Sequence, residues 1–179
     1  PRGNRTGKSM TQVWTILDLE ELLSQEEWQA ADKVTYTLLL QGVNREAEGW
    51  LSAESIAYLP CQLLHQIDHA WVKASYGQFG FSVQSDIYQA LCQTDARQFC
   101  WHVDWLLFNL RPVAFFKFYD FLNFSLEAPK GHLPALWYWK LPWLESWKAG
   151  GFGTGRGAGF ADFTTLDAFM LRLSRCSQI

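Results

Sequence analysis

The stretch that decides the fold is Phe108–Trp147, which reads FNLRPVAFFKFYDFLNFSLEAPKGHLPALWYWKLPWLESW. From Trp101 to Trp147, 14 of 47 residues are aromatic, about twice the 16% found in the whole chain. Aromatic side chains bury large areas and offer flat faces for stacking. The turn Ala128–Pro134 divides the stretch, because its two prolines restrict the residues before them. We therefore expect one aromatic layer to fold back on another.

The charged residues of this stretch are few, and its cations lie between rings. The cations here and just beyond are Arg111, Lys117, Lys130, Lys140 and Lys148, and the carboxylates are Asp120, Glu127 and Glu145. One interpretation is a surface for a flat, apolar partner that carries acid groups. The other is a dense aromatic core with scattered surface lysines. Composition alone favours the core.

Length and charge limit the possible functions. A chain of 179 residues is long enough for one main domain. Its net charge of −3 argues against a general nucleic-acid binder, which needs clustered cations. No apolar run reaches the roughly 20 residues that a membrane helix needs. We expect a soluble cytosolic monomer, in which residues 1–12 are a disordered or artificial leader.

The sequence predicts neither a catalytic site nor a metal bound by the protein itself. The cysteines Cys61, Cys92, Cys100 and Cys176 form no C-x-x-C pair, so we expect reduced, mostly buried thiols. His65 and His69 are four residues apart, but the HExxH pattern of metalloproteases is absent. No nucleophile motif such as G-x-S-x-G occurs. The chain is therefore not expected to be an enzyme.

The apolar periodicity is helical and predicts an all-α fold of seven to nine helices in a single domain. Helices are expected over 17–24, from a Ser24 capping box to about Gln41, over 61–76, 83–91 and 96–103, and from a Thr164 capping box onwards. Asp32 lies beside a buried stripe, where we expect a hydrogen bond or ion pair that fixes helix packing. The glycine-rich segment 150–159 is expected to be a linker or lid. With it, the last helix forms a 148–179 region that docks on the main domain.

Several phrases together resemble a known family. They are LeuLeu at 22–23, Trp28, AlaAsp at 31–32, Thr35, PheGlyPheSerValGln at 79–84 and AlaPro-x-GlyHisLeuPro at 128–134. Over about residues 13–147 the chain resembles the genomes-uncoupled family of tetrapyrrole-binding regulators. The resemblance implies a cupped-hand helical domain whose apolar palm binds protoporphyrin IX or magnesium-protoporphyrin IX. It also implies a non-catalytic regulator of magnesium chelatase in chlorophyll biosynthesis, from a photosynthetic organism such as a cyanobacterium.

The resemblance also implies site residues. Phe118 stands where the family has a palm aromatic, and Lys140 where it has a first arginine near the porphyrin propionates. Trp143 replaces a second arginine, and Trp137 replaces a polar residue. His132, in the turn, is expected to be structural. The expected ligand-binding residues are Phe118, Lys140, Trp137, Trp143, Trp50, Arg45, Phe115 and Arg111, with Lys140 as the first choice for the propionates and Arg45 and Arg111 as assistants.

Three alternatives stay open at this stage. A paralogue that binds a linear bilin would have the same features. The same palm could instead grip a protein, and the large subunit of magnesium chelatase is the partner that the family implies. An enzyme that attaches a bilin is the least favoured, because no cysteine lies in the recognised motifs. The family also implies the cyanobacterial cytosol, with peripheral membrane association as an option.

Overall fold

The computed structural model describes residues 13–110, 113–148, 155–156 and 163–177. Within these ranges the chain is mainly helical. The elements are α1 (Ile16–Ser24), α2 (Trp28–Gly42), α3 (Ala53–Ile56), α4 (Cys61–Ala74), α5 (Phe81–Asp86), α6 (Ala96–His102), strands β1 (Leu106–Leu110) and β2 (Val113–Phe116), then α7 (Leu136–Trp139), α8 (Trp143–Lys148) and α9 (Thr164–Cys176). A π-helical turn η1 (Ile87–Leu91) continues α5, and a 3₁₀ turn η2 (Tyr119–Phe121) follows β2.

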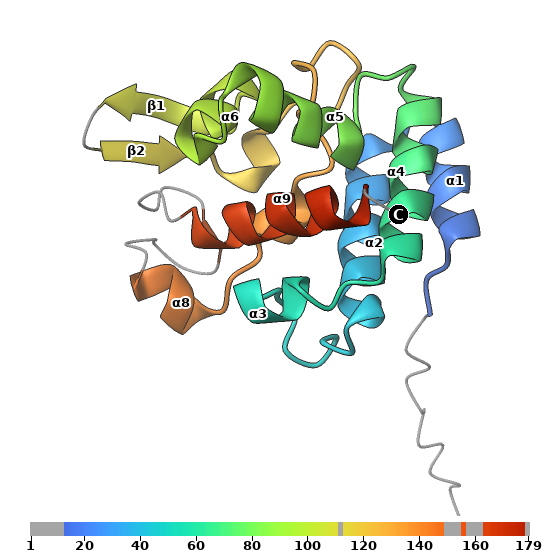
Figure 1. The fold of residues 1–179 in the computed structure, drawn as a ribbon. Coiled ribbons are helices and arrows are strands. Elements are labelled where there is room, and N and C mark those ends of the chain that lie inside the picture. The colour runs from blue at the N-terminus through green and yellow to red at the C-terminus, as the bar shows by residue number, and fades with distance from the viewer. Residues whose placement is uncertain (1–12, 111–112, 149–154, 157–162, 178–179) are drawn as a thin grey trace, which may run out of the picture.

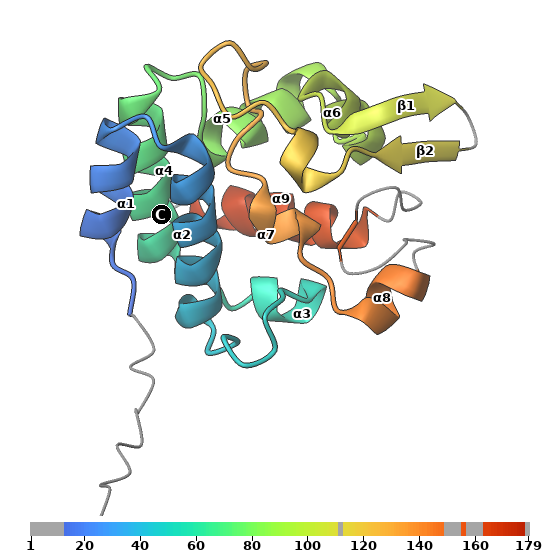
Figure 2. The same cartoon turned by 180° about the vertical axis from the view of Figure 1, so that it is seen from behind.

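The helices pack in a body from which one hairpin projects. Helices α1, α2 and α4 stand side by side at one end, and the β1–β2 hairpin lies at the other end beside α6 (Figures 1 and 2). Helix α9 crosses the middle and contacts α3, α4 and α5, while α7 lies against α2. None of the described helices is long and apolar enough to cross a membrane.

The hairpin is the one departure from the all-α prediction, which the structure otherwise confirms. Strands β1 and β2 are antiparallel, with Leu106 opposite Phe116, Phe108 opposite Phe115, and an irregularity between the two pairs. The rings of Phe108 and Phe115 lie 4.8 Å apart. Neither strand alternates polar with apolar residues, so the period-two signal of a half-buried strand was missing from the sequence.

One expected helix start is wrong. The Ser24 hydroxyl donates to the Glu21 carbonyl at 2.7 Å, which places Ser24 at the end of α1 instead of at the start of α2. Helix α2 begins after Glu27, with no side-chain cap. Helix α9 begins at Thr164 as predicted, although Thr164 is its first helical residue and Phe163 is its N-cap. A short cap motif also occurs by chance, and tertiary packing decides where a helix begins.

The aromatic stretch folds back on itself at the predicted turn. Trp105 and Phe116, which precede the turn, pack on Tyr138 and Trp139, which follow it. The Trp105 and Tyr138 rings stack with centroids 5.6 Å apart. The prediction of two aromatic layers is therefore confirmed.

The turn is held by the segment that joins α4 to α5. The Gly80 amide donates to the Leu133 carbonyl at 3.1 Å, and the Gly131 amide donates to the Gln78 carbonyl at 2.8 Å. The buried Gln84 amide group donates to the carbonyls of Gly131 and Pro134. Gly131 has a φ of +78°, and a Cβ atom there would lie 2.7 Å from the Ile87 side chain. The turn therefore requires glycine at this position.

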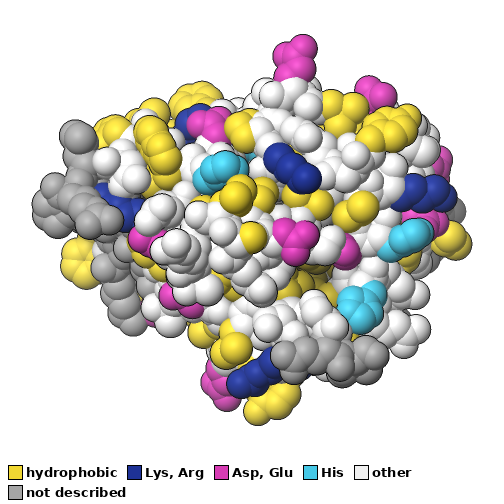
Figure 3. Space-filling view, turned by 45° about the horizontal axis from the view of Figure 1, so that its top comes forward, with side chains coloured by type: hydrophobic (Ala, Val, Ile, Leu, Met, Phe, Trp, Pro, Cys, Tyr) yellow, Lys and Arg dark blue, Asp and Glu magenta, His cyan; other side chains and the backbone are white. Residues whose placement is uncertain are grey.

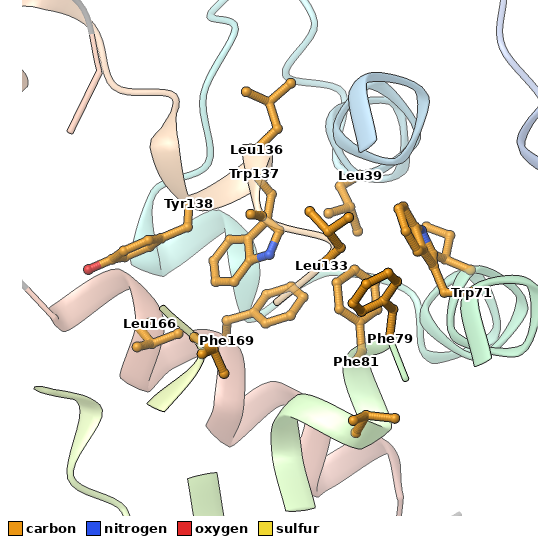
Figure 4. Close-up of a cluster of buried hydrophobic side chains, with 14 of the residues drawn as sticks. Leu39, Trp71, Phe79, Phe81, Leu133, Leu136, Trp137, Tyr138, Leu166 and Phe169 are labelled. Carbon is orange, nitrogen blue, oxygen red and sulfur yellow. The ribbon is translucent and has the colours of Figure 1, made fainter. Parts of the chain in front are cut away.

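Helix α9 packs against α7 and contributes side chains to the core. Trp137 points towards α9, and its ring stacks on Phe169 with centroids 3.9 Å apart (Figure 4). Phe169 also meets Phe81 of α5 edge to face. Over α5, α6 and α9 the outer surface mixes acidic, basic and apolar side chains (Figure 3).

The prediction of four reduced thiols is wrong for two of them. Cys61, at the start of α4, forms a disulfide with Cys176, at the end of α9. Their Cα atoms lie 5.3 Å apart, although the residues are 115 positions apart in sequence. Only the docking of α9 brings them together, which cysteine spacing cannot indicate. Cys92 and Cys100 are free and buried, as expected.

The disulfide predicts a stability that depends on reductant. Cross-linking residues so far apart in sequence lowers the entropy of the unfolded chain, by about 4–5 kcal/mol in the loop-entropy model. We expect Cys61→Ser combined with Cys176→Ser to lower the free energy of unfolding in urea by about that amount. Dithiothreitol should lower it similarly in the wild type and not further in the variant. Cys92→Ser is the control that should keep the response to reductant. A wild type that is indifferent to reductant would contradict the cross-link.

Candidate functional site

A cavity of about 460 Å³ opens between α2, η2 and α7. We call this cavity the palm. Its walls come from three segments that are distant in sequence and from one residue of the glycine-rich segment. The lining residues are Lys33, Tyr36 and Thr37 of α2, Phe118, Tyr119 and Asp120 around η2, Leu136, Trp139 and Lys140 at α7, and Gly155.

The palm combines aromatic side chains with two cations. The Tyr36 hydroxyl donates to the Gly49 carbonyl, and Trp139 Nε1 donates to the Lys117 carbonyl at 3.0 Å. Tyr36 is partly exposed and can offer its ring to a ligand, whereas Trp139 is only 3% exposed and has little free surface. Phe118 is 46% exposed and meets Phe121 edge to face. A flat apolar molecule would suit such a wall.

A buried carboxylate ties the three walls together behind the palm. Asp32 of α2 is fully buried and accepts hydrogen bonds from the amides of Ala135 and Leu136, at 2.9 and 3.0 Å. It also accepts one from the Tyr119 hydroxyl at 3.0 Å. The bonds join α2 to the start of α7 and to η2. The prediction that Asp32 fixes packing through hydrogen bonds is confirmed.

Burial dominates the electrostatics of this pair. Desolvation raises the pKa of Asp32 to about 7, although its three hydrogen bonds act in the opposite direction. Desolvation and the neighbouring Asp32 raise the pKa of Tyr119 far above its ordinary value. Tyr119 therefore keeps its proton and remains a hydrogen-bond donor to Asp32.

The charged groups of the palm stay available to a ligand. Lys33, Asp120 and Lys140 are exposed, and none of them forms an ion pair with another residue that the structure describes. Two cations and one carboxylate therefore line a cavity that also has aromatic side chains in its walls. Such a set can bind an acid-bearing ring through charge-assisted hydrogen bonds.

Among the expected site residues that the structure describes, two line the palm, namely Phe118 and Lys140. Arg45 and Trp50 lie in the loop after α2, where the Arg45 guanidinium sits 5.2 Å from the Trp50 ring centroid. Arg45 lines a separate, more polar cleft with Glu48 and Tyr58. The bond from Tyr36 to Gly49 connects this loop to the palm wall.

The remaining expected residues lie elsewhere. Trp137 is 1% exposed and points into the core, since its ring packs on Phe169. Trp143 is 60% exposed on α8 and stacks parallel to Trp147 with centroids 6.5 Å apart, but it does not line the cavity. Phe115 packs on Phe108 in the hairpin. Arg111 lies outside the described residues, as do Phe152 and most of the glycine-rich segment.

Sequence reasoning missed most of the palm. Lys33, Tyr36 and Thr37 share one face of α2, because residues three or four apart are neighbours on a helix. The available signal was this polar and aromatic face next to the apolar stripe of Ala31, Thr35 and Leu38. Tyr119 and Trp139 gave no comparable signal, since rings surround both in the sequence.

The expected structural role of His132 is confirmed. Its Nδ1 lies 2.6 Å from the Val103 carbonyl, and its Nε2 accepts a hydrogen bond from the Asn123 amide at 3.2 Å. Burial lowers the pKa of His132, so the ring is neutral. Among the described residues, no group of three or more His, Cys, Asp or Glu side chains could hold a metal ion.

The pKa of Asp32 predicts how stability depends on pH. Its folded value of about 7 exceeds the ordinary 3.8, so the folded protein holds this proton more tightly than the unfolded chain. The stabilisation is complete below pH 4 and is lost as the pH rises through 7. We expect the free energy of unfolding of the wild type, minus that of Asp32→Asn, to fall by about 2 kcal/mol from pH 5 to pH 7.

Urea unfolding at a series of pH values measures this difference. Asp32→Asn is expected to be less stable throughout, because its amide group meets two backbone donors, and the trend with pH is therefore the decisive quantity. Tyr119→Phe serves as the control, since it keeps the carboxylate and should keep the trend. A difference that stays constant or grows with pH would mean that Asp32 is ionised in the folded protein throughout this range.

Comparisons with known protein sequences point to a single family. A family model described as GUN4-like matches residues 10–148. The chain is 35% identical to a protein called ycf53 from Porphyra purpurea over 136 residues, which are 75% of this chain and 55% of that protein. It is 33% identical to a protein from Arabidopsis thaliana named "Tetrapyrrole-binding protein, chloroplastic", over 67% of this chain and 48% of the relative. The chain thus spans about half the length of the relatives that it matches.

Two solved structures are also similar to this chain. The ligand-free structure of Arabidopsis thaliana GUN4 superposes with a TM-score of 0.58 and 30% identity, and covers 71% of this chain and 86% of that one. The structure of GUN4 from Chlamydomonas reinhardtii superposes with a TM-score of 0.59 over 70% of this chain and 82% of that one. At 24% identity, this second likeness concerns the fold alone.

Proposed function

We propose, because this chain belongs to the GUN4-like family, that it binds a tetrapyrrole in the palm without transforming it chemically. Membership confirms the family resemblance seen in the sequence. The observation that carries the proposal is the palm itself, in which aromatic rings meet two lysines that form no ion pair with any described residue. The name of the Arabidopsis thaliana relative supports the same ligand class.

The energetics of a flat ring fit this cavity. Covering about 300–400 Å² of a macrocycle contributes on the order of 7–10 kcal/mol before costs are counted. The loss of ligand freedom and the ordering of side chains oppose binding by several kcal/mol. The net affinity for a porphyrin should then be about micromolar or better.

Two lysines on different walls would bind the ligand's carboxylates. Lys140 follows α7, and Lys33 lies on α2 across the cavity lining. A lysine makes a point contact, whereas an arginine holds a carboxylate with two parallel bonds. We therefore propose that the ring is oriented less firmly than the arginines of the family would hold it. Lys33 would supply the second cation, since Trp143 stands in this sequence where the resemblance implies an arginine.

Titration with protoporphyrin IX tests the binding site. Quenching of tryptophan fluorescence should saturate in the wild type. Lys33→Ala and Lys140→Ala should each weaken binding about fivefold, because one partly screened ion pair is worth roughly 1 kcal/mol. Lys73→Ala on α4, which lines a different cleft, is the matched control and should bind normally.

Esterified ligands give a second measure. The dimethyl ester of protoporphyrin IX lacks both carboxylates, so it should bind to the wild type more weakly than the free acid does. The affinity for the ester should be the same in the wild type and in each lysine variant. If the variants bind protoporphyrin IX as tightly as the wild type does, and the wild type binds the ester as tightly as the free acid, neither lysine belongs to the site. If no porphyrin and no bilin binds, the proposed function is wrong. A preference for a linear bilin would identify the paralogue instead.

We also propose that the chain acts as a regulator in chlorophyll biosynthesis that stimulates magnesium chelatase through contact with its large subunit. Family membership supports this step. Helix α8 offers a suitable apolar surface, since Trp143, Leu144 and Trp147 are each more than half exposed. We place the protein in the cyanobacterial cytosol, as a monomer that associates with membranes at most peripherally.

A chelatase assay separates regulation from ligand binding. Added wild-type protein should raise the rate of magnesium insertion into protoporphyrin IX. Trp143→Ser combined with Trp147→Ser should lower that stimulation severalfold and leave porphyrin affinity within about twofold, because neither ring lines the palm. Stimulation that survives in the variant would exclude α8 as the contact. No stimulation by the wild type would exclude the chelatase role and leave tetrapyrrole binding in place.

A further inference from the structure

Two residues of the glycine-rich segment, Gly155 and Arg156, are held against the end of α7. Gly155 lines the palm, and its carbonyl accepts a hydrogen bond from the buried Ser146 hydroxyl of α8 at 2.6 Å. Its φ is +99°, and a Cβ atom there would lie 3.0 Å from the Trp139 carbonyl oxygen. This conformation favours glycine, which lets the backbone pass close to α7 at the edge of the palm.

Arg156 fixes this segment to α7. The residue is buried, and its Nε donates to the Tyr138 carbonyl at 2.7 Å. Its backbone amide donates to the Trp139 carbonyl at 3.1 Å. The guanidinium carbon lies 4.0 Å from the centroid of the Tyr138 ring, which is within the range of a cation–π contact. Arg156 therefore holds α7 through two carbonyls and one aromatic ring.

The two carbonyls belong to the end of a very short helix. Helix α7 spans only Leu136–Trp139, and the last carbonyls of a helix have no partner within the helix itself. Arg156 donates to both of them. Lys140 is the next residue along the chain and one of the two cations that line the palm. The bonds from Arg156 therefore fix the backbone from which the Lys140 side chain starts.

Arg156 acts on the palm from behind the cavity lining. It does not line the palm, whereas the residue before it does. Both residues also lie beyond residues 10–148, which are those that match the family model. This part of the wall is therefore built by a segment outside the region that the family defines.

We propose that Arg156 is a positioning residue of the tetrapyrrole site, which holds Gly155 at the cavity and fixes the end of α7 so that Lys140 meets a carboxylate of the ligand. This inference rests on the proposed tetrapyrrole binding. A lysine side chain is flexible and makes a point contact, so its benefit depends on where the backbone places it. Loss of Arg156 should therefore remove most of the contribution of Lys140, although Arg156 does not touch the ligand.

A double-mutant cycle between Arg156 and Lys140 tests this coupling by fluorescence titration with protoporphyrin IX. In the wild type, Lys140→Ala should weaken binding about fivefold, as expected for one partly screened ion pair. In the Arg156→Gln background the same change should weaken binding less than about twofold, because the effects of residues that act together do not add. If Arg156 acted only through its charge, from a distance, the two effects would add.

The dimethyl ester separates positioning from a general loss of stability. A less stable fold would weaken binding of the free acid and of the ester by the same factor. Arg156→Gln should instead reduce the preference for the free acid over the ester, because Lys140 no longer meets the carboxylate. Arg156→Lys retains a cationic donor at this position and should recover part of the preference. It also serves as the test variant if Arg156→Gln does not fold.

Arg172→Gln is the matched control. Arg172 of α9 also donates from Nε to a backbone carbonyl, that of Leu59 at 2.9 Å, but it does not line the palm or contact α7 through that bond. This variant should keep the affinity and the preference of the wild type.

The outcomes separate this inference from the proposed function. The inference is wrong if Lys140→Ala has no effect in the wild type, or if it has the same effect with and without Arg156. It is also wrong if Arg156→Gln and Arg172→Gln behave alike. In each of these cases tetrapyrrole binding still stands. If the wild type binds neither the free acid nor the ester, both proposals are overturned.

Discussion

The palm depends on one buried carboxylate. Asp32 accepts hydrogen bonds from the first amides of α7 and from the hydroxyl of Tyr119, so a single side chain of α2 sets the positions of the other two walls. Desolvating a carboxylate is unfavourable, and three donors offset much of that cost. Loss of any of these donors would leave a buried polar group unsatisfied, and the walls would lose their common partner. The geometry of the cavity is thus fixed from behind, by a residue that does not line it.

The motifs that identify the family lie outside the palm. The phrases 79–84 and 128–134 bond to each other through Gly80 and Gln84, and none of their residues lines the palm. Their sequence is constrained by backbone geometry, since Gly131 needs a positive φ and Gln84 must reach two carbonyls. Sequence could therefore indicate the family and the mainly helical fold, while it left open which residues line the palm.

What the sequence could not indicate depended on contacts between distant residues. The apolar stripes of α2 and α4 are local and predicted both helices, whereas the partner of Cys61 lies 115 positions away. The hairpin was missed because neither of its strands alternates polar with apolar residues, which is the pattern that predicts a half-buried strand. Lys33 was missed because only the approach of α7 turns that face of α2 into a cavity wall. Lys140 and Phe118 were found because the resemblance supplied what local pattern did not.

Trp137 and helix α9 pack on each other in this chain. The resemblance implies a polar residue at position 137, but here an indole faces inward and stacks on Phe169. Phe169 belongs to α9, which lies beyond the residues 10–148 that match the family model. A tryptophan turned into the core needs an apolar partner on that side, and α9 provides it. The disulfide at the end of α9 then holds this helix to α4. The back of the α7 wall is therefore apolar and cross-linked, so the cations of the palm come from groups that line the cavity itself, namely Lys33 of α2 and Lys140 after α7.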